Sequence, residues 1–298
     1  MLDALLRSGL QLPYSCKSGV CGSCMMRAAP ETPPPPRAQI GLKDSWRAQG
    51  YVLPCVCQPE GDLLALPIGD EVRVAASIES VGRLSASVLR VGVQLDAPFD
   101  GRAGQFITLL RGDGLARSYS IASLSRPDSL ELHVRVIANG RMSQWLASGG
   151  EVVGVRVQVQ GPSGECFYLG GREDQPLLLA GTGTGLAPLY GILRDALAQG
   201  HRGPIHLFHG ALDRDGFYLE EELTALASQH ANLVYTPTAF ATDGAIDRVI
   251  LGCHPGLAGW RVFLCGDPGV VQTCRKKIFL SGAALNDIHA DAFQPSAS

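Results

Sequence analysis

Hydrophobic residues in the middle of the chain come in short runs that are separated by glycine and polar residues. The runs between residue 72 and about residue 170 are Val72–Val74, Ser87–Val91, Phe106–Leu110, Leu130–Ile137 and Val152–Gln160. Short runs rich in β-branched residues, with turn residues between them, are typical of antiparallel strands. The pattern therefore predicts an antiparallel β-barrel in this part of the chain.

The spacing of hydrophobic residues changes in the last third. Leu177–Ala180 is a short apolar run that predicts a buried strand, and a glycine-rich turn separates it from a helical stretch that reaches Ala198. Further apolar runs predict strands at Ile205–Phe208, Leu233–Tyr235 and Val262–Cys265. Strands that alternate with helices indicate a parallel α/β domain, which binds ligands at the carboxyl ends of its strands.

Composition and charge fit a folded chain of more than one domain. A chain of 298 residues is too long for one average domain. Its composition, 46% hydrophobic and 18% charged, is too apolar for a disordered chain. A net charge of −3 gives no general attraction to nucleic acid or anionic lipid. The uncharged run from Gln175 to Leu193 contains several glycines and prolines, which favours a strand, turn and helix over a membrane span. The N-terminus lacks the pattern of a secretion signal, so we expect a cytoplasmic protein without membrane insertion or bound nucleic acid.

Five of the nine cysteines, namely Cys16, Cys21, Cys24, Cys55 and Cys57, fall in the first fifth of the chain. In a reducing compartment, such a cluster indicates metal binding rather than disulfides. The first three follow C-x4-C-x2-C, the spacing of plant-type [2Fe-2S] ligands, with a fourth thiolate from farther along the chain. Small residues between them allow backbone N–H groups to turn toward the sulfur atoms. Zinc is the alternative, but the sequence offers only one C-x2-C pair and no nearby histidine, which favours iron and sulfur.

The segments around these cysteines resemble a plant-type ferredoxin domain. Leu2–Leu10 looks like its first helix and Pro13–Cys24 looks like its cluster loop. The fourth ligand of such domains lies in a Gly-Tyr-x-Leu-x-Cys segment, which is residues 50–55 here. The resemblance begins at the helix and so implies a truncated β-grasp domain without its opening hairpin. It implies four cluster ligands, with Cys57 as the alternative to the last: Cys16, Cys21, Cys24 and Cys55.

An Arg-Ser-Tyr-Ser motif at residues 117–120 lies inside the predicted barrel. The arginine can hold a phosphate with two hydrogen bonds, and the tyrosine two residues later, on the same face of a strand, can lie against a planar ring. Gly104-Gln-Phe precedes the motif, and Gly140-Arg-Met-Ser and Gly161-Pro-Ser-Gly follow it. This order resembles the ferredoxin-NADP reductase superfamily, and the resemblance implies a bound FAD.

In that superfamily the motif residues have separate roles. The resemblance implies that Arg117 contacts the flavin phosphates, that Tyr119 packs on the isoalloxazine ring and that Ser120 acts as a catalytic residue near its N5 edge. It also implies that the start of a helix after Gly140 receives the pyrophosphate. The remaining FAD-binding residues implied by the resemblance are Ser118, Gly140, Arg141, Met142 and Ser143.

The turn after the first strand of the last third departs from the G-x-G-x-x-G fingerprint, because Leu186 stands at the third glycine. The turn does resemble the G-T-G-T-G-x-A-P segment of the same superfamily. The resemblance implies a bound nicotinamide coenzyme, with Cys265 beside the nicotinamide as a second catalytic residue. It also implies that Phe293 covers the flavin until the nicotinamide displaces it. The coenzyme-binding residues implied are Gly181, Thr182, Gly183, Thr184, Gly185, Cys265, Gly266, Asp267 and Pro268.

The residues after the second predicted strand of this domain bear on the choice of coenzyme. Asp213 and Asp215 flank Arg214 there. Two carboxylates would repel the 2′-phosphate of NADPH, whereas carboxylates can bind ribose hydroxyls. We therefore expect NADH, with NADPH as the alternative.

Together the resemblances predict a multidomain α+β protein. We expect a truncated β-grasp ferredoxin domain over residues 1–69, an antiparallel β-barrel that binds FAD over 70–171 and a parallel α/β domain that binds NAD over 172–298. This order resembles the reductase components of multicomponent oxygenases. It implies that electrons pass from NADH through FAD and the [2Fe-2S] cluster to a terminal oxygenase component, Rieske-type or di-iron, or to another one-electron acceptor protein. The alternatives are a reductase for a nucleotide-sugar 3-deoxygenation enzyme and a cluster-binding redox sensor with poor turnover.

Overall fold

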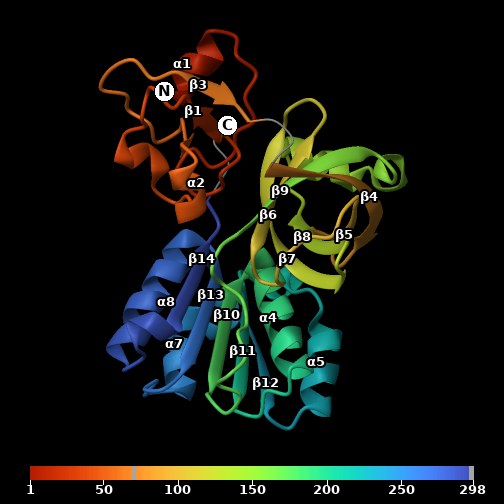
Figure 1. Ribbon diagram of the computed structural model, residues 1–298. Coiled ribbons are helices and arrows are strands. Elements are labelled where there is room, and N and C mark those ends of the chain that lie inside the picture. The colour runs from red at the N-terminus through yellow and green to blue at the C-terminus, as the bar shows by residue number, and fades with distance from the viewer. Residues whose placement is uncertain (69–71, 295–298) are drawn as a thin grey trace.

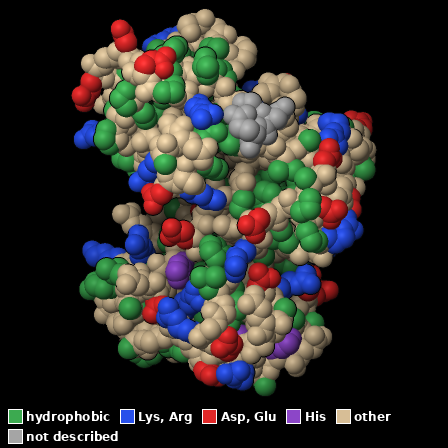
Figure 2. All heavy atoms as spheres, in the orientation of Figure 1, with side chains coloured by type: hydrophobic (Ala, Val, Ile, Leu, Met, Phe, Trp, Pro, Cys, Tyr) green, Lys and Arg blue, Asp and Glu red, His purple; other side chains and the backbone are tan. Residues whose placement is uncertain are grey.

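A computed structural model describes residues 1–68 and 72–294 of the chain, so the predicted boundary between residues 69 and 70 lies outside the described residues. An N-terminal region and a β-barrel lie side by side above an α/β sheet domain (Figure 1). The surface is hollowed where the N-terminal region meets the sheet domain, and acidic and basic side chains are mixed over the face in view (Figure 2). Within the described residues, no helix has both the length and the apolar character needed to cross a bilayer.

The N-terminal region is a small antiparallel sheet that is covered by loops and short helices. Its strands lie in the order β2-β1-β3, and its core includes Leu2, Met25 and Val52. The predicted first helix is present but ends at Arg7 rather than Leu10. The elements are α1 (Leu2–Arg7), β1 (Met26–Ala28), η1 (Pro36–Gln39), α2 (Asp44–Ala48), β2 (Tyr51–Val52) and β3 (Ala65–Pro67).

The middle of the chain forms the predicted antiparallel barrel, closed in the order β4-β5-β8-β7-β6-β9. Alternate residues of its strands, such as Ile107 and Leu109, fill the interior. The expected strand over Val152–Gln160 is wrong in its first half, because η3 ends at Val152 and β9 starts only at Arg156. The elements are β4 (Arg73–Arg83), β5 (Val88–Leu95), β6 (Phe106–Arg111), β7 (Ala116–Arg126), β8 (Ser129–Arg135), α3 (Arg141–Ala147), η3 (Gly149–Val152) and β9 (Arg156–Ser163).

The last third forms the predicted parallel sheet, with strand order β12-β11-β10-β13-β14. Successive residues of β10 pack in different cores: Leu177 and Leu179 with α4, and Leu178 with α7 and α8. Helices therefore cover both faces of the sheet (Figure 1). The elements are β10 (Leu177–Thr182), η4 (Gly183–Gly185), α4 (Leu186–Ala198), β11 (Ile205–Ala211), η5 (Arg214–Gly216), α5 (Glu220–Gln229), β12 (Leu233–Ala239), α6 (Phe240–Asp243), α7 (Ile246–Cys253), β13 (Arg261–Gly266), α8 (Pro268–Leu280), η6 (Leu285–Asp287) and β14 (Ile288–Ala292).

Helix α4 packs directly against the barrel and fixes the sheet domain to it. At Gly191, a Cβ atom would come within 2.6 Å of the Ala103 side chain and 2.8 Å of the Ala122 carbonyl oxygen. Glycine is therefore the residue that allows the helix to approach the barrel backbone this closely. The close contact brings the barrel strand β7 near the turn that follows β10.

Candidate functional site

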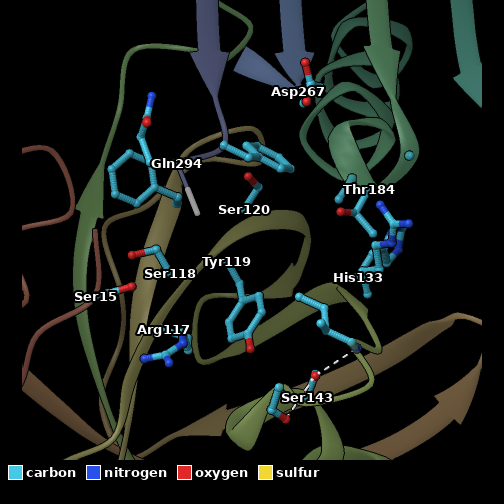
Figure 3. Close-up of a pocket in the computed structure, with 18 of the residues that line it drawn as sticks. Ser15, Arg117, Ser118, Tyr119, Ser120, His133, Ser143, Thr184, Asp267 and Gln294 are labelled. Atoms are coloured by element: carbon cyan, nitrogen blue, oxygen red, sulfur yellow. Dashed lines mark hydrogen bonds between the residues drawn. The ribbon is translucent and has the colours of Figure 1, made fainter. Parts of the chain in front are cut away.

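A single cavity of about 2430 Å³ opens where the three regions meet. A drug-sized ligand needs roughly 300–1,000 Å³, so the space is large enough for more than one ligand. Figure 3 shows side chains from the barrel, among them Arg117 and Tyr119, facing Thr184 and Asp267 of the sheet domain across this space. Cys16 and Cys21 of the N-terminal region also line the cavity.

The loop that carries the first three cysteines turns backbone N–H groups toward sulfur. The N–H groups of Ser18 and Cys21 both donate to Cys16 Sγ at 3.4 Å. Such a tight turn needs left-handed backbone conformations, which Lys17, Gly19 and Gly22 adopt with φ of 53°, 81° and 68°. Interactions with the side chain of Cys21 and with Ser18 hold the pKa of the Cys16 thiol well below its usual value, which favours the thiolate. Thiolates with N–H donors around them are what an iron–sulfur cluster requires.

Cys24 and Cys55 form a second pair of thiols at the same place. The interaction between the two thiols lowers the pKa of Cys55 and raises that of Cys24. The nearby charge of Cys16 acts in the opposite direction on Cys55 and raises its pKa. Cys57 instead belongs to the apolar core of the N-terminal region, where it is 2% exposed and burial raises the pKa of its thiol. The arrangement therefore brings together the four predicted ligands and leaves Cys57 apart from them.

The arrangement of these cysteines differs from that of a site for a single metal ion. Within residues 1–68 and 72–294, no three His, Cys, Asp or Glu side chains are grouped as they would be around one metal ion. The thiols instead affect one another's pKa in two pairs, Cys16 with Cys21 and Cys24 with Cys55. A cluster of two irons and two sulfides is larger than one ion, and its four ligands are spread more widely, so these thiols fit a cluster better than a single ion.

The predicted flavin residues of the barrel lie together on one side of the cavity. Arg117, Ser118, Tyr119 and Ser120 belong to β7 and all line the cavity. Among the described residues, Arg117 has no carboxylate partner, and its guanidinium donates only to the carbonyl oxygen of Ala116. A half-buried cation of this kind fits an anionic group such as a phosphate.

The segment at the start of α3 lies next to these residues. Gly140 is the N-cap of the helix, and a Cβ atom there would come within 2.4 Å of Ser143 Oγ. That hydroxyl donates to the Gly140 carbonyl oxygen and accepts from the N–H of Ile137, which holds the turn in place. Gly140, Arg141, Met142 and Ser143 line the cavity, and their contact with FAD stays a prediction.

Ser120 has a partner that the sequence analysis missed. Its hydroxyl donates to Asp291 Oδ2 at 3.5 Å, from β7 of the barrel to β14 of the sheet domain. Burial raises the pKa of Asp291 to about 6, while the hydrogen bond from Ser120 lowers it in part. A carboxyl group with this pKa can hold or release a proton near neutral pH at the point where barrel and sheet meet. Phe293, two residues later, lines the cavity, and its N–H donates to the Gly266 carbonyl oxygen.

The glycine-rich turn lies at the carboxyl ends of β10 and β13. Thr182 Oγ1 accepts a hydrogen bond from the N–H of Asp267, which ties the two strand ends together. The Asp267 side chain caps α8 by accepting from the N–H groups of Gly269 and Val270. At Gly185, a Cβ atom would come within 2.3 Å of the Cys265 carbonyl oxygen, so only glycine permits the turn to rest on β13.

The predicted coenzyme residues divide into two groups. Those that line the cavity are Thr182, Gly183, Thr184, Gly266, Asp267 and Pro268. Gly181, Gly185 and Cys265 lie behind them, outside its lining. The Cys265 thiol is 1% exposed and its Sγ is 3.6 Å from that of Cys166. Contact of Cys265 with a nicotinamide therefore stays a prediction.

Two further features of the sheet domain face the cavity. Asp213 and Asp215 line it, whereas Arg214 between them does not. Thr238, at the end of β12, also lines it and was not predicted from the sequence. Its hydroxyl is buried without a hydrogen-bond partner among the described residues. A buried hydroxyl without a partner is costly, so Thr238 Oγ1 fits a polar group of a bound ligand.

Three family models match the chain in the order of its three structural regions. They are the 2Fe-2S iron-sulfur cluster binding domain at residues 1–60, the oxidoreductase FAD-binding domain at residues 75–168 and the oxidoreductase NAD-binding domain at residues 179–276. The prediction of a [2Fe-2S] cluster, FAD and a nicotinamide coenzyme is confirmed.

Relatives match over nearly the whole chain. The ferredoxin–NAD(P)+ reductase component of the naphthalene 1,2-dioxygenase/salicylate 5-hydroxylase systems of a Ralstonia species is 32% identical, over 99% of this chain and 94% of the relative. The CDP-6-deoxy-L-threo-D-glycero-4-hexulose-3-dehydrase reductase of Yersinia pseudotuberculosis is 28% identical, over 99% and 93%. The crystal structure of the Amycolatopsis cytochrome P450 reductase GcoB has a TM-score of 0.72 and 30% identity, over 99% and 94% of the two chains.

Serine substitutions test the fourth cluster ligand. We expect Cys55→Ser to lose most of its iron and acid-labile sulfide, because the thiolate that completes the ligand set is removed. Cys57→Ser, the matched control in the same segment, should keep both, since Cys57 packs in the core. Iron and sulfide analysis of purified protein, with the flavin absorption as an internal standard, measures the outcome. Cluster loss in the Cys57 variant alone would show the assignment to be wrong.

The raised pKa of Asp291 predicts a pH-dependent stability difference. The folded protein holds this proton up to about pH 6, whereas an unfolded aspartate releases it near 3.8. The wild-type protein therefore loses stability as pH rises from about 4 to about 6, by about 2 kcal/mol after allowance for solvent exposure. Asp291→Asn removes this dependence, so its melting temperature should rise relative to wild type as pH increases from 4.5 to 7.5.

The release of flavin fluorescence on heating provides the measurement. Asp100→Asn, which alters an exposed aspartate of the barrel, is the control and should show a constant difference from wild type over the same pH range. An equally constant difference for Asp291→Asn would contradict the assignment of a buried, titrating carboxyl group.

Proposed function

We propose a function from the premise that this chain belongs to the family of iron–sulfur flavoprotein reductases that join a 2Fe-2S domain to FAD-binding and NAD-binding domains. The protein oxidises NADH and passes the electrons through FAD and the [2Fe-2S] cluster to the terminal component of an oxygenase system. The relatives named for such systems cover the full order of domains, and not one domain alone.

One observation carries this proposal: a single cavity connects the three regions. Cys16 and Cys21 line it from the N-terminal region, Arg117 and Tyr119 from the barrel, and Asp267 from the sheet domain. A route for electrons needs its carriers close together, and these residues bring the three binding regions to one place. Domains that did not exchange electrons would have no need of a shared cavity.

The chemistry explains why three carriers are combined. NADH gives up two electrons together as a hydride, whereas a cluster and the metals of an oxygenase accept one electron at a time, and a flavin handles both kinds of transfer. One NADH and two oxidised acceptors thus give NAD+, one proton and two reduced acceptors. The protein residues bind and orient the carriers, and Ser120 with Asp291 provides a site that can hold a proton beside them.

The acidic lining of the sheet domain supports NADH over NADPH. Asp213 and Asp215 face the cavity while Arg214 does not. Asp213 is held in position by the N–H of Gly216, which donates to its carboxylate at 3.2 Å. Two carboxylates at this position would repel a 2′-phosphate. We also place the protein in the cytoplasm, where NADH is available and where its nine cysteines would remain reduced.

A second candidate acceptor is a nucleotide-sugar 3-deoxygenation enzyme. The Yersinia relative named as a hexulose-3-dehydrase reductase covers the same share of this chain as the oxygenase relatives do. The higher identity to the oxygenase reductase component, 32% against 28%, favours the oxygenase acceptor. Purified oxygenase and dehydrase components, each offered to the reduced protein, would separate the two candidates.

An anaerobic titration with NADH tests the proposed route. We expect both the flavin and the cluster absorption bands to bleach, in protein whose iron and acid-labile sulfide match its flavin content. Bleaching of the flavin alone would instead indicate the redox sensor or a flavin reductase. Onward reduction of cytochrome c measures turnover, and a protein that bleaches fully but does not reduce an acceptor would contradict the proposed function.

Removal of the two acidic charges should weaken the preference for NADH. In Asp213→Asn/Asp215→Asn, the amide oxygen at position 213 can still accept from Gly216, so the local turn is kept. We expect kcat/KM for NADPH to rise about tenfold or more, because a tenfold change corresponds to about 1.4 kcal/mol and the loss of two close charge repulsions is worth roughly 1 kcal/mol each. The value for NADH should fall or stay constant. An unchanged ratio of the two kcat/KM values would show that these carboxylates do not select the coenzyme.

A further inference from the structure

A row of three polar side chains crosses the outer face of the barrel under the N-terminal region. In the sheet, Thr108 on β6 pairs with Ser118 on β7 on one side and with Gln160 on β9 on the other. Ile107 and Leu109, its neighbours along β6, pack inside the barrel, so the alternation of the strand turns Thr108 outward. Thr108 is nevertheless only 1% exposed and Gln160 only 4%. An outer face this well covered is an internal interface.

The row binds two consecutive carbonyl groups of the cysteine loop. Thr108 Oγ1 donates to the Cys21 carbonyl oxygen at 3.1 Å, and Gln160 Nε2 donates to the Gly22 carbonyl oxygen at 2.8 Å. Thr108 Oγ1 also lies 3.2 Å from Ser118 Oγ. One threonine hydroxyl therefore contacts both a predicted cluster ligand and Ser118, a residue that lines the cavity.

The conformation of the loop explains why these donors come from another domain. The N–H groups of Ser18 and Cys21 are turned toward Cys16 Sγ, so they are not available to the carbonyl groups of the loop. The Gly22 carbonyl oxygen accepts one hydrogen bond from within the loop, from the Met25 N–H at 3.0 Å, and Gln160 supplies its second. Buried carbonyl groups need donors. An apolar side chain in place of Thr108 or Gln160 would leave these oxygens with fewer partners, so the polar row fits this loop and not a general apolar interface.

We propose that Thr108 and Gln160 are positioning residues that hold the cluster loop against the flavin cavity. The inference rests on the proposed function, because it concerns the step from flavin to cluster. The two electrons of each NADH cross this interface one at a time, and two one-electron acceptors finally take them up. The two residues act through the Cys21 and Gly22 carbonyl groups, and their loss lowers the fraction of molecules in which the loop is docked.

Near-isosteric substitutions test the proposal. Thr108→Val removes the hydroxyl and keeps the shape, whereas Thr108→Ser keeps the hydroxyl and is the matched control. Gln160→Glu replaces the donor to Gly22 by a carboxylate oxygen that repels the carbonyl group. It keeps an oxygen for Arg73, whose Nε is 3.5 Å from Gln160 Oε1. This second variant does not touch Ser118, so it separates docking from any effect on the flavin cavity.

Hydrogen exchange in the holoprotein measures docking directly. We expect amides of residues 16–24 to exchange about tenfold faster in Thr108→Val and in Gln160→Glu, because one lost hydrogen bond shifts the docking equilibrium by about this factor. Thr108→Ser should match the wild type. In anaerobic stopped-flow mixing with NADH, the flavin band should bleach at the wild-type rate in every variant. The cluster band should bleach several-fold to about tenfold more slowly in the first two variants only.

The outcomes separate this inference from the proposed function. Wild-type exchange and wild-type cluster reduction in both Thr108→Val and Gln160→Glu would overturn the role of the polar row. If Thr108→Val loses its cluster during purification, the comparison of Gln160→Glu with Thr108→Ser decides. Failure of the proposed electron route from flavin to cluster has a different signature, since the cluster band would then stay oxidised in the wild-type protein as well.

Discussion

The hydrogen-bond needs of one short loop determine how the N-terminal region attaches to the rest of the molecule. A loop whose N–H groups point at sulfur cannot pair all of its own carbonyl groups, and a buried carbonyl group without a donor is costly. Thr108 and Gln160 of the barrel supply donors to Cys21 and Gly22. The same contact that satisfies the loop therefore also places it beside the cavity. Stability of the interface and proximity of the carriers have one physical cause.

Close backbone packing has the corresponding role on the side of the sheet domain. Gly185 rests on the Cys265 carbonyl group, and Gly191 of α4 rests on the barrel. These contacts leave no room for a side chain, so the turn after β10 is fixed by shape rather than by charge. The charged residues Asp213 and Asp215 are then free to face the cavity from the next strand end. Glycine sets the position of the turn, and in the proposed function the carboxylates set the coenzyme preference.

The parts of the site that the sequence predicts are those in which the chemistry lies within a few neighbouring residues. C-x4-C-x2-C, the Arg-Ser-Tyr-Ser segment and the glycine-rich turn each contain their own geometry, and the strands around them follow from short apolar runs. The contacts between distant residues could not be predicted in this way. Thr108 is 87 residues from Cys21, and Ser120 is 171 residues from Asp291. Neither pair has a pattern of its own, because only the folded sheets bring the members together.

Strand β14 is a second feature that the sequence alone could not predict. It is five residues long, with a mixed sequence of Ile, His, Ala, Asp and Ala. Neither alternation nor a β-branched run marks it as a strand, and it forms because β13 offers an open edge for parallel pairing. Asp291 acquires its position and its raised pKa only through this pairing. Asp291 is thus a candidate functional residue that local sequence propensity could not predict, because its position depends on tertiary structure.

The register of β7 connects these contacts. Ser118 and Ser120 are two residues apart and so share one face of the strand, while Arg117 and Tyr119 share the other. On the first face, Ser118 reaches Thr108 beside the cysteine loop, and Ser120 reaches Asp291 of the sheet domain. A slip of one residue would exchange the two faces and break both connections at once. The pairing of Ser118 with Thr108 therefore does more than fix the register of the barrel, because it also places β7 in contact with the cysteine loop and with the sheet domain.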